Sequence, residues 1–180
     1  MDTSAQSQRD RTDAKLRYAQ VHFAELKEHG LLNGNDFERA HQESFLFHLL
    51  GVRDALLAEI NIHYGAGLAK DALSLGKLRA ALTARGLSSP ELKTLYELEK
   101  DTQSWYSIAK LMRDHSAHVQ GVSRRMLVGG KEDGIVQLKH PKTGELSSSH
   151  IIGDFADWLK FMAALVKCFR SSTSAHARCA

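Results

Sequence analysis

Residues 37–64 read FERAHQESFLFHLLGVRDALLAEINIHY and form the longest stretch with one regular pattern of apolar side chains. Five large apolar residues recur in it at intervals of three or four: Phe45, Leu49, Val52, Leu56 and Ile60. This spacing places them on one face of an α-helix. A capping sequence precedes the stretch at Asn35, and Gly65 follows it. The pattern predicts a long amphipathic helix with a broad apolar face.

Four other segments show helical spacing, and a short polar region interrupts them before the last one. The expected helices cover residues 14–29, 69–84, 90–118 and 151–169. Between the last two, residues 135–139 and 145–148 are expected to pair as strands around the turn at 140–144. The predicted fold class is all-α: an antiparallel helical bundle of about five helices with a small β-hairpin before the last helix.

The chain length of 180 residues suits one domain with a sizeable core. We expect that single helical domain at residues 12–170. Residues 1–11 are rich in Ser, Gln, Arg and Asp, and residues 171–180 read SSTSAHARCA. Both segments lack apolar side chains to pack, so they are predicted to be disordered tails.

The composition indicates an ordinary globular protein, with 43% apolar and 25% charged residues and a formal net charge of +3. No apolar run approaches the roughly 20 residues that span a bilayer, and no secretory signal is evident. The two cysteines, Cys168 and Cys179, lack metal-ligand spacing. We therefore expect a cytoplasmic protein without membrane association, metal or cofactor.

The segment with most chemical potential is residues 111–119, LMRDHSAHV. It contains Arg113, then the polar residue Asp114, and His118 after four intervening positions. Histidine titrates near neutral pH and transfers protons. A guanidinium suits bidentate contact with phosphate and stabilises developing negative charge. Asp114 lies four residues before His118, a helical spacing at which a carboxylate can orient an imidazole.

In these three residues, and in its helical setting, the chain resembles the HEPN superfamily, whose ribonuclease members carry an arginine, a polar residue and a downstream histidine. The resemblance implies metal-independent RNA cleavage by a homodimer, as in toxin or defence proteins, with a cognate antitoxin as a further partner. By the same resemblance His118 is the proton-transfer group, Arg113 holds the scissile phosphate, and Asp114 orients its neighbours.

The spacing of the motif sets a geometric condition. Arg113 and His118 are five residues apart, which is about 140° around an unbroken helix. The two side chains can therefore act on one phosphate only if two chains combine their motifs, or if the helix bends or ends before His118. The plainer interpretation is that Arg113 and Asp114 are ordinary surface or ion-paired residues and that His118 caps a helix end.

Basic residues follow the motif at Arg124, Arg125 and Lys131, where they are predicted to bind RNA phosphates. A solvated loop explains the same residues without a ligand.

Two other functions remain open from the sequence. The first is a HEPN-like scaffold that binds RNA or protein without catalysis. The second is a metal-binding helical bundle built on His48, Glu59 and His63, although the further carboxylates of a di-metal site are not evident. The apolar face of the segment from Phe155 to Phe169 either closes the core or forms a dimer interface.

Overall fold

The computed structural model describes residues 3–29, 35–116, 122, 124–126 and 135–176. Within them lie six helices and one two-stranded antiparallel sheet. In chain order these elements are α1 (Thr3–His29), α2 (Asp36–His63), α3 (Leu75–Ala84), α4 (Pro90–Lys100), α5 (Trp105–His115), β1 (Arg124–Met126), β2 (Val136–Leu138) and α6 (Ile151–His176). The expected mostly helical fold, with a small sheet before the last helix, is confirmed.

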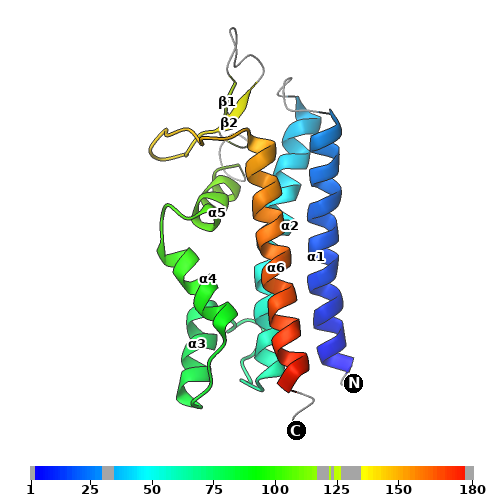
Figure 1. The fold of residues 1–180 in the computed structure, drawn as a ribbon, viewed down its shortest axis with the longest axis vertical. Helices are drawn as coiled ribbons and strands as arrows, with labels where there is room; N and C mark the ends of the chain where they lie inside the picture. The colour runs from blue at the N-terminus through cyan, green and yellow to red at the C-terminus, as the bar shows by residue number, and fades with distance from the viewer. Residues whose placement is uncertain (1–2, 30–34, 117–121, 123, 127–134, 177–180) are drawn as a thin grey trace.

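The three longest helices, α1, α2 and α6, lie side by side, and α3, α4 and α5 follow one another along a flank of this group (Figure 1). The sheet lies at one end of the molecule and both chain termini lie at the other (Figure 1). α2 and α6 both run from the sheet end towards the termini, whereas α1 runs in the opposite direction. None of the described helices is long and apolar enough to cross a membrane.

Side-chain caps explain where four of the helices begin. Asn35, Ser74, Ser89 and Ser104 each accept a hydrogen bond from the backbone N–H three residues later, at the starts of α2, α3, α4 and α5. Each cap satisfies an N–H group that has no partner within its helix. The starts of these helices are therefore local properties of the sequence.

The expectation of one continuous helix over residues 90–118 is wrong, because the chain turns between Lys100 and Trp105. Asp101 adopts an extended conformation, and its side chain accepts a hydrogen bond from the backbone N–H of Gln103 at 2.9 Å. Ser104 then caps α5 and also donates to the carbonyl oxygen of Leu98. These short polar side chains offer the backbone an alternative to helical hydrogen bonds.

The helix expected over residues 69–84 begins later, at Leu75. The side chain of Asn61 holds the preceding loop by donating to the carbonyl oxygen of Leu68 at 2.9 Å and accepting from its N–H at 3.1 Å. This clamp joins residues seven positions apart and occupies the carbonyl oxygen of Leu68, which would accept the first hydrogen bond of a helix beginning at residue 69.

The predicted terminal tails also differ from the structure. α1 begins at Thr3, so residues 3–11 are helical, and α6 continues through residues 171–176. Arg170 of α6 donates a hydrogen bond to the carbonyl oxygen of Arg9 in α1 at 3.2 Å. This tertiary contact joins the first of these segments to the rest of the fold, although its own composition is too polar to predict a packed helix.

The sheet contains the predicted strand, but its main partner is a different segment. β2 lies within residues 135–139 and pairs with β1, Arg124 opposite Leu138. Residues 145–148 contribute only one bridge, between Leu146 and Lys139. The N–H of Leu138 donates to the hydroxyl of Ser147 at 3.1 Å instead of to a strand carbonyl, which ends this second pairing.

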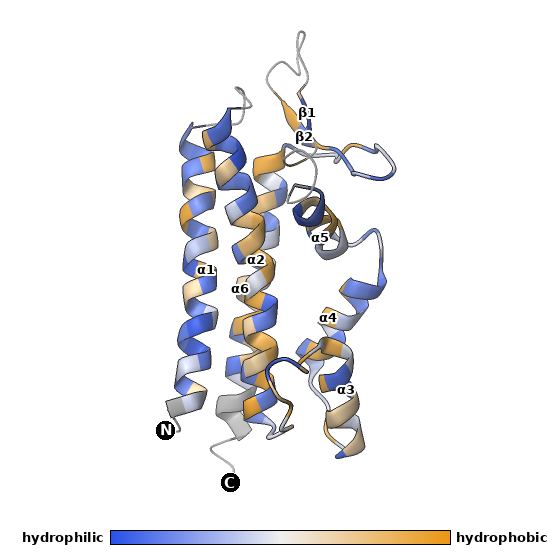
Figure 2. Ribbon diagram, turned by 180° about the vertical axis from the view of Figure 1, so that it is seen from behind, coloured by the Kyte–Doolittle hydropathy of each residue, from blue (hydrophilic) through white to orange (hydrophobic). Residues whose placement is uncertain are grey.

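The core lies between α2 and α6, where apolar residues are concentrated, whereas most of α1 is hydrophilic (Figure 2). Phe155 is fully buried, and its ring stacks on that of Phe45 with centroids 4.5 Å apart. Trp158 and Phe169 are also buried within the single chain. The apolar face of α6 therefore closes the core of the protomer, which decides between the two roles that spacing left open.

Candidate functional site

Arg113 and Asp114 form an ion pair at the C-terminal end of α5. Asp114 Oδ1 accepts hydrogen bonds from Arg113 Nε at 3.0 Å and from Nη2 at 2.7 Å. The two side chains remain 35% and 48% exposed. Both bonds use the same edge of the Arg113 guanidinium, so Asp114 fixes the orientation of this group. The Nη1 atom of Arg113, on the other edge, forms no hydrogen bond with another described residue.

The described part of the motif helix, α5, reaches His115. Ser116 keeps a helical conformation, donating its N–H to the carbonyl oxygens of Met112 and Arg113 and its hydroxyl to that of Arg113. His118 itself lies outside the described residues.

A buried tyrosine, Tyr106, lies one to two turns before Arg113 on the same helix and was not predicted as part of a site. Burial raises the pKa of Tyr106 to about 12, so the phenol stays neutral at physiological pH. Nearby, Arg53 pairs with Glu99 and with Asp54, each at 2.7 Å. Arg113 thus stands beside a network in which the other charged groups are already paired.

The predicted RNA-binding residues have different surroundings. Arg124, in β1, donates to Glu38 at 3.1 Å, and this glutamate is only 2% exposed in the first turn of α2. Arg124 therefore ties the sheet to α2. Arg125, the next residue of β1, is exposed. Lys131 lies outside the described residues.

A pocket of about 280 Å³ connects the motif helix to the sheet and to the start of α6. Trp105, Met112, Leu138 and Trp158 contribute apolar walls, and the two indole rings stack with centroids 5.9 Å apart. Met112 precedes Arg113, and Leu138 is the register partner of Arg124. The end of α5 and the base of the sheet therefore share one cavity.

Two buried polar atoms of the pocket-lining residues have no hydrogen-bond partner among the described residues: Trp105 Nε1 and Asp154 Oδ2. Asp154 Oδ1 accepts from the hydroxyl of Ser149, whereas the hydroxyl of Ser147 donates to a backbone carbonyl oxygen. Burial raises the pKa of Asp154 above its ordinary value. Buried polar groups are normally satisfied in proteins, and these two atoms have hydrogen-bonding capacity that the described residues leave unused.

Sequence reasoning missed Asp154 and assigned both tryptophans to the core alone. Asp154 lies in the first turn of α6, where a carboxylate is ordinary because it complements the helix dipole. What marks Asp154 is that it lines the same cavity as the two tryptophans. This arrangement exists only in the folded chain.

His48, one of the residues considered as metal ligands, belongs to a cluster of three histidines on α1 and α2. His22 Nδ1 lies 3.2 Å from His41 Nδ1, and the His22 ring stacks on that of His48. Burial lowers the pKa of His22 and of His48, and the neighbouring His41 and Lys15 lower these pKa values further.

Glu59 does not join this histidine cluster, because it bonds to Arg170. His63 packs against Phe169 and Tyr64. Within the described residues, no group of three or more His, Cys, Asp or Glu side chains is arranged to hold a metal ion. The three residues singled out for a metal site are therefore not brought together.

Comparison of the chain with models of protein families, with curated proteins and with solved structures finds no match.

Proposed function

We propose that this protein is a HEPN-like helical RNA-binding protein that cleaves RNA without a metal ion. The observation that carries the proposal is the guanidinium of Arg113, which Asp114 orients at the end of α5, five residues before His118. The exposed Arg125 of β1, at the sheet end of the molecule, adds positive charge. Such groups bind the RNA backbone irrespective of its sequence.

In the proposed reaction, Arg113 holds the scissile phosphate through its Nη1 side while Asp114 keeps the guanidinium oriented. Arginine is suited to this role because its planar donors match phosphate oxygens. His118 transfers the proton of the 2′-hydroxyl or of the leaving oxygen. A second copy of the chain contributes its own motif to the same cleft, as the resemblance to the HEPN superfamily implies.

The test is RNA cleavage by purified protein in excess EDTA. We expect the wild type to cut RNA, and His118→Ala and Arg113→Ala to lose about 100-fold or more in rate. Arg11→Ala is the matched control, because Arg11 is an exposed arginine in the N-terminal half of α1. Absence of cleavage by the wild type, or equal cleavage by all variants, contradicts the proposal.

The second candidate function is RNA or protein binding without catalysis. It is favoured by a specific observation: Arg113 and Arg124 are both paired with carboxylates, which reduces the positive charge they present to RNA. In this case RNA binds in EDTA but is recovered intact, and Arg125→Ala weakens binding more than His118→Ala does. Filter binding at several salt concentrations, with gel analysis of the recovered RNA, separates the two functions.

A further inference from the structure

We infer that the pocket between α5, the segment after β2 and the start of α6 binds an unpaired nucleobase of RNA. The choice of RNA rests on the proposed function, but the evidence for a planar, hydrogen-bonding occupant comes from the pocket itself.

The aromatic wall of the pocket suits a flat ring. Trp105 is part-buried and Trp158 is 7% exposed, and their rings are 28° from parallel. Phe161 packs on Trp105 at 5.4 Å between centroids and supports this wall. Nucleobases stack on such side chains irrespective of base identity, because every base has a π-face.

The polar groups of the pocket exclude most other occupants. Trp105 Nε1 is only a donor, and Asp154 Oδ2 supplies an acceptor when ionised. A hydrocarbon chain would leave both atoms unpaired, and an anion would meet the carboxylates of Asp154 and Glu145. A nucleobase carries both donors and acceptors on one edge and has no charge of its own. It is therefore the component of RNA that matches this cavity.

The position and size of the pocket agree with a base whose phosphate stays outside. Met112, which lines the pocket, lies in the last turn of α5, the turn that also carries Arg113 and Asp114. A volume of about 280 Å³ is at the small end for ligand pockets and suits one ring system rather than a base pair. The pocket thus selects single-stranded RNA, loops or ends.

Intrinsic tryptophan fluorescence reports directly on this pocket, because Trp105 and Trp158 are the only tryptophans of the chain. The probes are short single-stranded homopolymers of 2′-O-methyl RNA, which lack the 2′-hydroxyl nucleophile and are not cleaved. Each is titrated into the full-length protein while a label on the RNA reports binding by anisotropy. We expect saturable quenching that follows the anisotropy change, and no quenching by a fully paired duplex.

The variant that tests the polar contact is Asp154→Asn, which keeps the shape of the side chain. We expect RNA affinity to fall about tenfold and the quenching to weaken. Asp157→Asn is the matched control, since Asp157 is an exposed carboxylate of the same helix and does not line the pocket. It removes the same charge and is expected to leave affinity unchanged.

The outcomes distinguish failure of this inference from failure of the proposed function. If RNA binds but tryptophan fluorescence does not change and Asp154→Asn binds like the wild type, the pocket inference is overturned and RNA binding stands. If free nucleosides quench saturably while RNA is neither bound nor cut, the base pocket is supported and the proposed function is overturned. If neither nucleosides nor RNA bind, both are overturned.

Discussion

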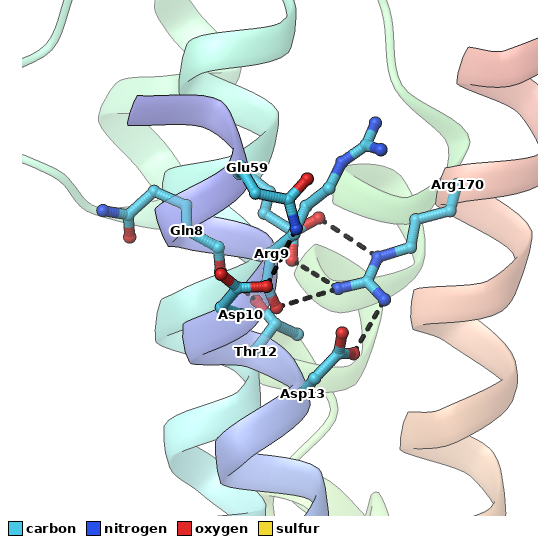
Figure 3. Close-up of polar contacts among 8 residues, drawn as sticks. Gln8, Arg9, Asp10, Thr12, Asp13, Glu59 and Arg170 are labelled. Carbon is cyan, nitrogen blue, oxygen red and sulfur yellow. Dashed lines mark hydrogen bonds and ion pairs between the residues drawn. The ribbon is translucent and has the colours of Figure 1, made fainter. Parts of the chain in front are cut away.

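The two ends of the long helices differ in whether their buried carboxylates have hydrogen-bond partners. At the end near the termini, Arg170 of α6 donates to Asp13 at 2.7 Å, to Glu59 at 3.0 and 3.3 Å, and to the carbonyl oxygen of Arg9 at 3.2 Å (Figure 3). The side chain of Glu59 is only 3% exposed. Arg170 therefore supplies hydrogen bonds to both carboxylate oxygens of this buried glutamate, and it joins α1, α2 and α6.

At the other end, the start of α6 contributes Asp154 to a cavity in which one carboxylate oxygen and the Trp105 N–H have no partner among the described residues. A buried polar group that stays unpaired lowers stability, whereas a paired group costs little. We therefore interpret the Arg170 cluster as structural and the pocket as the site of the ligand inferred above.

The largest loss of stability is expected from placing a charge in the apolar core between the two ends. Phe155 is fully buried between Phe45 and Trp158, so Phe155→Asp places a carboxylate where no polar partner exists. We expect loss of the folded state, a cost above about 4 kcal/mol. Circular dichroism and gel filtration measure it, with Lys160→Asp at an exposed position as control. A folded Phe155→Asp monomer would mean that this face is not the core.

A smaller effect is expected at the closed end. Arg170→Met leaves the carboxylate of Glu59 buried without its partner, which should cost about 3 kcal/mol of the free energy of unfolding. RNA affinity should stay unchanged, because the pocket is at the other end. Urea unfolding measures the stability change, with Lys167→Met as an exposed control on the same helix.

Adding Glu59→Gln to the Arg170→Met chain removes the unpaired charge and should recover part of the lost stability. If Arg170→Met is as stable as Lys167→Met, the ion-pair cluster is not structural and the contrast between the two ends fails.

The smallest effect on stability is expected from the protonation of two histidines, His22 in α1 and His48 in α2. Their pKa values are lowered below the ordinary 6.5, mainly by burial, so the folded state favours neutral His22 and His48. This contribution to stability is present above pH 6.5 and is lost as the pH falls through the folded-state pKa.

The urea midpoint of the wild type should therefore fall on acidification more than that of His22→Gln/His48→Gln. His29→Gln, at an exposed histidine that pairs with Glu25, should follow the wild type. Parallel pH curves for all three proteins would contradict the assigned pKa shifts.

Much of the helical structure was predictable because its signals are local. The spacing of Phe45, Leu49 and Leu56 predicted α2, and the capping sequence at Asn35 is a cap in the structure. The break at Asp101 and Ser104 was missed, although both are short polar residues that compete with helical hydrogen bonds. The helical spacing of apolar residues continues across Asp101 and Ser104, and the prediction of one continuous helix followed this spacing.

The pairing of β2 and the helical ends were not predictable in the same way. β1 was not expected as a strand, because its three residues, two of them arginines, show no alternation of apolar and polar side chains. Residues 3–11 appear too polar to pack, yet Asp13 and the Arg9 carbonyl oxygen meet Arg170 more than 150 positions later. Pairing and packing depend on partners that are distant in the chain.

The sequence by itself determined that α2 and α6 are helices, the cap that opens α2, and which side chains make up the motif at Arg113 and Asp114. These follow from backbone geometry and from side-chain chemistry within a few residues. Only the tertiary structure decided that the α6 face closes the core, that Glu59 pairs with Arg170, and that Trp105, Asp154 and Trp158 surround one cavity. Burial and the presence or absence of a hydrogen-bond partner are properties of residues brought together from separate segments, so no single stretch of sequence contains them.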